Sequence, residues 1–146
     1  MKRKVTLKDD TEAEVIINII GKNGGIDLLL HDLKHRQLGC LYSQSKVNKE
    51  GDWYLYLQDI HTSSINKGYG SILLSILLEE IKNNKEFENI KYIYGGLSSI
   101  DMDDHKDRLI HFYQKNNYTI KLYDKPSVKN HDGISYGEIK LEIDRS

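Results

Sequence analysis

Two glycines, Gly68 and Gly70, stand just ahead of the most apolar helical pattern in the chain, within INKGYGSILLSILLEEI, residues 65–81. Glycine costs a helix roughly 1 kcal/mol relative to alanine, so this pair indicates that the backbone itself is needed there. The first turn of a helix offers free N–H groups and a positive dipole end, and glycines let a phosphate reach them. We therefore predict an anion site, with a simple tight turn as the alternative.

The other residues that could do chemistry favour structural roles. Cys40, the only cysteine, lies in the strand-like QLGCLYS and is expected to be a buried thiol. His31 and His35 have the spacing of a helical metal pair, but they fall in a strand–turn region where that spacing does not converge. The segment DMDDHKD, residues 101–107, departs from the calcium-loop pattern. We expect no metal.

Charge and length narrow the classes of partner. The 146 residues include 21 basic and 22 acidic ones, for a net charge of −1 without long runs of one sign. This pattern favours neither nucleic acid nor an anionic membrane as a partner. The start MKRKVTLKDD leads into no apolar core of signal-peptide length, so we expect a cytoplasmic protein.

The first half of the chain reads as a series of strands. EVIINII, residues 14–20, is rich in β-branched residues and predicts a strand, although Thr11 and Glu14 have capping-box spacing that would suit a helix. KNGG, residues 22–25, is typical of a hairpin turn. WYLYLQDI, residues 53–60, is apolar or aromatic at most positions, which predicts a central strand covered on both faces.

The second half changes to a helical period. Apolar residues recur at helical spacing over 72–81, and a second helix is expected over 104–117, ending in a left-handed cap at Asn116 and Asn117. Strands are expected over 90–97, 118–124 and 134–143, with a loop over 125–133. The order of elements predicts an α+β fold, with a mostly antiparallel sheet and two main helices in the second half, in one domain over residues 1–146.

The order of elements over residues 53–120, together with two short motifs, resembles the GNAT superfamily of acyl-CoA-dependent N-acyltransferases. INKGYG resembles the family's pyrophosphate motif [Q/R]-x-x-G-x-[G/A], and FYQKNNY, residues 112–118, resembles a pattern such as FYEKLGF on a later helix. Ile65 replaces the usual Gln or Arg, and Lys106 stands where the family often has Asn. The family also places two helices between its first strands that help to form the acceptor pocket, and no such helices are expected here.

The resemblance implies how acetyl-CoA is held as a co-substrate. In the family, the strand before the glycine loop splays from its neighbour, and its unpaired backbone groups bind the pantetheine arm. The matching strand residues are Ile60, His61 and Thr62. The remaining cofactor-binding residues carried over from the motif are Ile65, Asn66, Lys67, Gly68, Tyr69, Gly70 and Ser71.

The resemblance also implies a direct attack of a primary amine on the thioester. It makes Tyr113 the general acid that protonates the departing sulfur, since a phenol stays protonated at neutral pH. Asp59 and His61 lie on one face of the strand end, and either is a candidate base or a structural residue.

The sequence does not distinguish between a small-molecule amine and an amine on a protein as the acceptor. It also leaves open whether the protein forms a homodimer. The acidic residues Asp101, Asp103, Asp104 and Asp107 form either a solvated loop or a local negative field that attracts a cationic amine. An alternative function is a GNAT-like module that binds acyl-CoA as a sensor or assembly element without turning it over.

Overall fold

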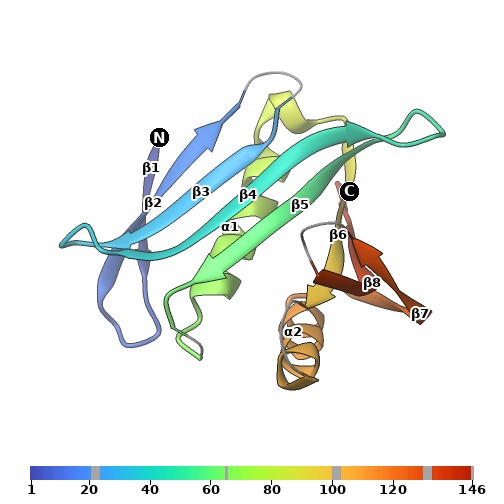
Figure 1. The fold of residues 1–146 in the computed structure, drawn as a ribbon. Helices are drawn as coiled ribbons and strands as arrows, with labels where there is room; N and C mark the ends of the chain where they lie inside the picture. Colours follow the sequence, from blue (N-terminus) through green and yellow to red (C-terminus); the bar gives the residue numbers. More distant parts are fainter. Residues whose placement is uncertain (21–23, 65, 100–102, 130–132, 146) are drawn as a thin grey trace.

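A computed structural model describes residues 1–20, 24–64, 66–99, 103–129 and 133–145, and it describes their side chains outside 98–106 and 125–135. Within this part, eight strands form one sheet in the order β1-β2-β3-β4-β5-β6-β8-β7, confirming the mostly antiparallel α+β fold (Figure 1). The elements are β1 Lys2–Thr6, β2 Glu12–Ile19, β3 Ile26–Asp32, β4 Gln37–Val47, β5 Trp53–Thr62, α1 Tyr69–Asn83, the short 3₁₀ helix η1 Lys85–Phe87, β6 Ile90–Ser99, α2 Asp103–Lys115, β7 Thr119–Lys129 and β8 Gly133–Glu142.

Strands β1 to β5 follow one another as an antiparallel meander. The strand prediction for EVIINII is confirmed, because Ala13, Val15 and Ile17 of β2 are buried at alternate positions, as a pleated strand requires. The predicted KNGG turn falls largely on residues 21–23, which lie outside the described residues. Cys40 is buried, as predicted.

Helix α1 covers one face of the meander and lies behind β3, β4 and β5 in Figure 1. Its inward stripe includes Leu73, Leu77 and Ile81, which are fully buried. Burial of one such side chain is worth about 1.5–3 kcal/mol, so this stripe holds the first turn of α1 firmly beside the end of β5. None of the described helices is long and apolar enough to cross a membrane.

The prediction that residues 53–60 are covered on both faces is wrong. Leu55 and Leu57 are buried against the α1 side, whereas Tyr54 and Tyr56 are half-buried and Gln58 is exposed. The aromatic residues suggested burial, but tyrosine has a polar end and an apolar body, so it also suits a half-covered face.

The second half supplies β6, α2 and the β7–β8 hairpin. The left-handed cap of α2 is confirmed, since Asn117 has a φ of 72°. The predicted loop over 125–133 is wrong over 125–129, where β7 continues to Lys129. Strand β7 is at the edge of the sheet, where Pro126 need not donate a ladder hydrogen bond.

Candidate acyl-donor site

The sheet opens between β5 and β6. The two strands run parallel and pair only from Trp53 with Ile90 to Tyr56 with Tyr94, although β5 continues to Thr62 and β6 to Ser99. Residues 57–62 of β5 therefore pair only with β4. Backbone groups on the other edge of this segment are available to a ligand.

A β-bulge marks the point where the strands diverge. Tyr42 of β4 pairs with Asp59 while Ser43 pairs with Leu57, so Gln58 is an extra residue in β5. A bulge bends its strand and redirects the side chains that follow it. Here the bulge places Asp59 and His61 on the face opposite α1. The bulge comes directly after the last residues of β5 that pair with β6.

The first turn of α1 points its N–H groups into the same region. Gly68 is the N-cap residue with a φ of 78°, no side chain caps the helix, and no acidic residue lies in its first turn. The first intrahelical bond is donated by Ile72 to the Gly68 carbonyl, at 3.1 Å. The N–H groups of Tyr69, Gly70 and Ser71 therefore have no partner within the helix, which is the arrangement that binds anions.

Gly70 has a packing role that the sequence analysis missed. A Cβ atom at this position would lie 2.8 Å from Cζ of Phe112, so α1 and α2 approach each other through the space that the missing side chain leaves. Gly68 differs, because a Cβ there would meet only Cδ of Lys8, at 3.9 Å. Gly68 is thus needed for its left-handed backbone, and Gly70 for helix packing.

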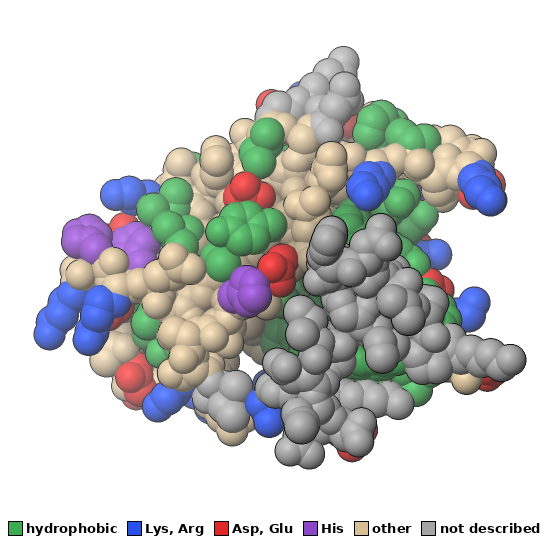
Figure 2. All heavy atoms as spheres, viewed as in Figure 1, with side chains coloured by type: hydrophobic (Ala, Val, Ile, Leu, Met, Phe, Trp, Pro, Cys, Tyr) green, Lys and Arg blue, Asp and Glu red, His purple; other side chains and the backbone are tan. Residues whose placement is uncertain are grey.

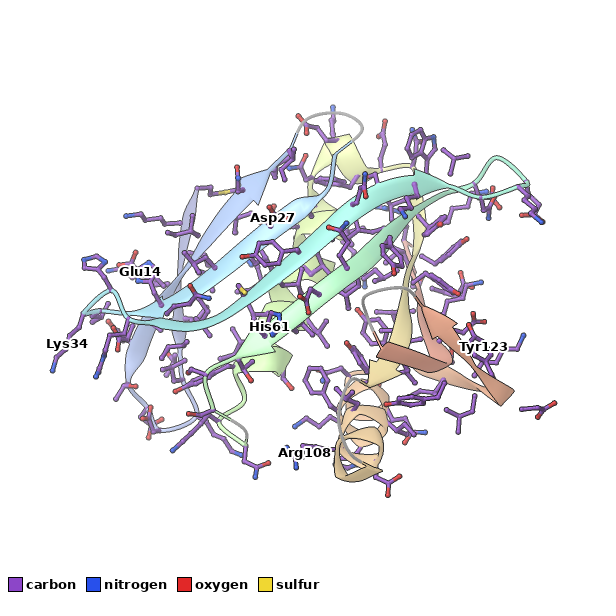
Figure 3. The ribbon with its side chains drawn as sticks, in the orientation of Figure 1. Glu14, Asp27, Lys34, His61, Arg108 and Tyr123 are labelled. Carbon is purple, nitrogen blue, oxygen red and sulfur yellow. The ribbon has the colours of Figure 1, made fainter. Side chains whose placement is uncertain are left out.

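A pocket of about 260 Å³ joins the open end of β5, the first turn of α1 and one side of α2. From α2 come the basic residues Arg108, His111 and Lys115, none of which the sequence analysis selected. Figure 3 shows Arg108 on α2, beside the turn between β5 and α1. The helical spacing of Arg108, His111 and Lys115 on one face of α2 was the signal that could have found them.

Asp59 and His61 form a pair on the open face of β5. Nε2 of His61 lies 2.7 Å from Oδ2 of Asp59, and the two side chains are 68% and 49% exposed, respectively. The pair is accessible to a molecule that approaches from the side opposite α1. The prediction that these two residues share a face is confirmed.

Tyr113 is buried in α2, with only 6% of its surface exposed. Burial raises the pKa of its phenol, and the nearby charge of Asp59 raises it further. Tyr113 is therefore protonated at neutral pH, and it lies close enough to Asp59 to be influenced by the carboxylate.

The histidines His31 and His35 lie closer than expected, with ring centroids 5.4 Å apart, because a register shift after Leu30 and a tight turn bring the rings together. Among the described residues, no three His, Cys, Asp or Glu side chains are grouped so that they could hold a metal ion.

The chain is similar to several solved structures. No protein-family model and no curated protein matches the chain. A GNAT-family acetyltransferase from Staphylococcus aureus is similar over 84% of this chain and 70% of its own, with a TM-score of 0.61 and 18% identity. Another from Streptococcus pneumoniae is similar over 85% and 69%, with a TM-score of 0.59 and 19% identity. Naa20 from Chaetomium thermophilum, solved with a bisubstrate analogue, is similar over 82% and 66%, with a TM-score of 0.60 and 10% identity. The chain has the GNAT fold.

The GNAT family places two helices between its first strands. In the part of the chain that the structure describes, no helix lies between β1 and β5. Strand follows strand from β1 to β5.

The residues carried over from the GNAT motif separate into three groups. One group lines the pocket and comprises Ile60, Thr62, Asn66, Gly68, Tyr69, Gly70 and Ser71. His61 and Lys67 do not line it. His61 is on the other face with Asp59, and Lys67 borders a smaller hollow of about 180 Å³ with Leu7 and Lys8. The third group is Ile65, which lies outside the described residues. Of the acidic segment, which was singled out for its charge, Asp101 also lies outside them, and the side chains of Asp103 and Asp104 are not described.

Proposed function

We propose that the chain transfers an acetyl group from acetyl-CoA to a primary amine. The observation that carries this proposal is that one pocket contains both the unpaired end of β5, at Ile60 and Thr62, and the first turn of α1. These two features suit the two parts of the donor. The amide groups of pantetheine can pair with a free strand edge, and the diphosphate can accept bonds from the helix N–H groups.

Basic residues on α2 support the same assignment. Arg108 and Lys115 line the pocket opposite the first turn of α1, where their charges would lie near the phosphates of CoA. We expect Arg108→Ala to weaken CoA binding several-fold at low salt and less at high salt, because screening reduces the contribution of an exposed charge.

In the proposed reaction, three side chains have roles. The lone pair of a neutral amine attacks the thioester carbonyl carbon, a C–N bond forms, and the C–S bond then breaks. The Tyr113 phenol gives its proton to the departing sulfur, which leaves as the CoA thiol. The proton lost by the amine nitrogen passes to the Asp59–His61 pair or to water, and the phenol is reprotonated from solvent.

In this proposal, proximity supplies most of the rate, because a donor in the pocket and an amine at the Asp59–His61 pair meet at the open end of β5. Burial keeps the proton on the Tyr113 phenol at every pH near neutrality, although the same rise in pKa makes the phenol a weaker acid.

The test combines calorimetric titration with acetyl-CoA and an assay for free thiol in the presence of small amines and short peptides. The proposal predicts saturable binding and amine-dependent thiol release. Binding without thiol release would instead favour the acyl-CoA sensor, and an absence of binding would exclude both functions.

A further inference from the structure

The sheet face opposite α1 is open over β2 to β5 in the part of the chain that the structure describes. Helix α1 contacts β3, β4 and β5 from one side, whereas α2 contacts β6 and β7. On the open side, Ile16 and Leu29 are only half-buried, and Tyr42 is 42% exposed. Figure 2, drawn from this side, shows hydrophobic groups among acidic and histidine side chains near the middle of the face.

Three side chains form a row across this face. Asp27 of β3 pairs with Tyr42 of β4, and Tyr42 pairs with Asp59 of β5, so the register places all three on the same side of the sheet. The pKa of the Tyr42 hydroxyl is raised by a side-chain hydrogen bond with Cys40, and also by the charges of Asp27 and Asp59. Both carboxylates are therefore near the tyrosine.

The two carboxylates differ in what already neutralises them. Asp59 is paired with His61, whereas no described residue forms an ion pair with Asp27. Figure 3 labels Asp27 and His61. Farther along the face, the Tyr56 ring already has a cation beside it, since Nζ of Lys46 lies 4.4 Å from the centre of that ring. The row at Tyr42 therefore offers a carboxylate that no described residue neutralises, whereas Tyr56 already has a cation beside its ring.

The spacing of the row sets the shape of an acceptor. Neighbouring strands are about 4.8 Å apart, so Asp27 and Asp59 are separated by roughly 10 Å across two strand spacings. An extended peptide advances about 3.3 Å per residue and covers that distance in about three residues. A small amine on an open face would keep much of its surface in water, whereas a peptide would also cover Tyr42 and Leu29.

We infer that the open face docks an extended polypeptide whose reacting amine lies at Asp59 and whose basic side chain, two or three residues away, lies at Asp27. This inference rests on the proposed acetyl transfer for the identity of the reacting group. The docking surface itself, with Tyr42 between two carboxylates, is a separate property that binding measurements can detect.

The experiment uses two peptides with a free N-terminal amine, no lysine, and either Arg or Gln at the fourth position. Thiol release with acetyl-CoA gives kcat/KM for each, and fluorescence anisotropy in the presence of CoA gives the affinity of C-terminally labelled versions. Wild type should prefer the Arg peptide by about 3- to 10-fold at low salt in both assays. Asp27→Asn should abolish the preference while leaving the Gln peptide unaffected.

The matched control is Glu14→Gln, which also removes one negative charge from the open face. Glu14 pairs with Lys4 of β1 and lies away from the row of Asp27, Tyr42 and Asp59. This variant should keep the preference for Arg. If wild type binds the Arg peptide preferentially through Asp27 but releases no thiol, the docking surface stands and the proposed function fails. Equal use or equal binding of both peptides by wild type overturns the inference, as does a preference that survives Asp27→Asn.

Discussion

Residues 53–56 of β5 pair with strands on both sides, whereas residues 57–62 pair with β4 alone. The first segment sits among tyrosines, with the rings of Tyr54 and Tyr92 stacked at 5.1 Å. The second segment carries the Asp59–His61 pair on one face and contributes to the pocket on the other. The bulge at Gln58 separates them. One strand thus provides a rigid anchor and, beyond it, an edge on which a ligand can complete the hydrogen bonding.

The open segment of β5, residues 57–62, suits a ligand for an energetic reason. A buried backbone group without a partner costs about 1–3 kcal/mol, so a strand edge beside a pocket gains from any ligand that supplies matching groups. The closed segment has no such gain, because its backbone partners are already in place. Substitutions at the open end should therefore change binding or turnover, and substitutions at the closed end should not.

The largest expected effect is on catalysis at the open end. Tyr113→Phe keeps the ring and removes the proton donor, so turnover should fall by about 100- to 10,000-fold while acetyl-CoA affinity stays the same. Steady-state kinetics and calorimetry measure the two quantities. Tyr56→Phe, at the closed end, should change turnover by less than about twofold, since its hydroxyl is remote from the reacting atoms. Wild-type turnover in the Tyr113→Phe variant would remove Tyr113 from the mechanism.

A smaller effect is expected on donor binding, and two glycines allow a matched comparison. Gly68 and Gly51 both have positive φ and open space around the position of a Cβ, but Gly68 precedes α1, whereas Gly51 lies in the turn between β4 and β5. Gly68→Asp places a negative charge beside the free N–H groups and should weaken CoA binding about tenfold.

Gly51→Asp should carry a similar backbone cost, about 1 kcal/mol of folding stability, without any change in CoA affinity. Chemical denaturation and calorimetry on both variants test this pair. Loss of CoA affinity in both variants to the same extent would mean that the effect reflects stability and not the helix terminus.

The smallest effect concerns pH. Burial raises the pKa of Tyr113 and of Tyr118, so the unfolded chain loses these protons at a lower pH than the folded one. Their stabilising contribution is present below pH about 10 and is lost as pH rises through the folded values, at up to about 1.4 kcal/mol per pH unit for each phenol. Urea denaturation between about pH 8 and pH 11, a range that spans the pKa of an unfolded tyrosine, measures the slope.

The double variant Tyr113→Phe/Tyr118→Phe should show a shallower fall in the free energy of unfolding over the same pH range. An unchanged slope would mean that these phenols do not resist ionisation in the folded protein. Tyr56→Phe again serves as the comparison, because Tyr56 is at the closed end and only half-buried.

Local patterns were sufficient to predict most elements. The β-branched run in β2, the apolar spacing of α1 and the Asn117 cap all act within a few residues, so the sequence alone indicates them. Continuation of β7 through Pro126 could not be predicted locally, because it depends on the edge position of that strand in the sheet.

Contacts that depend on the register of the sheet or the docking of α2 were also missed. Asp27 and Asp59 are brought to one row by two strand pairings, and Arg108 reaches the pocket through the packing of α2. The glycine motif did identify the first turn of α1, but it could not reveal that Gly70 is needed by Phe112. Tertiary packing decides which side of a helix or strand faces a site.

Amide hydrogen exchange with and without acetyl-CoA tests the central claim most directly, because it reports on each segment of β5 separately. The account predicts that acetyl-CoA slows exchange in peptides covering residues 57–62 and 69–71 and leaves residues 53–56 unchanged. Protection that is absent from residues 57–62 and 69–71 at saturating acetyl-CoA, or that appears only at 53–56, would contradict it.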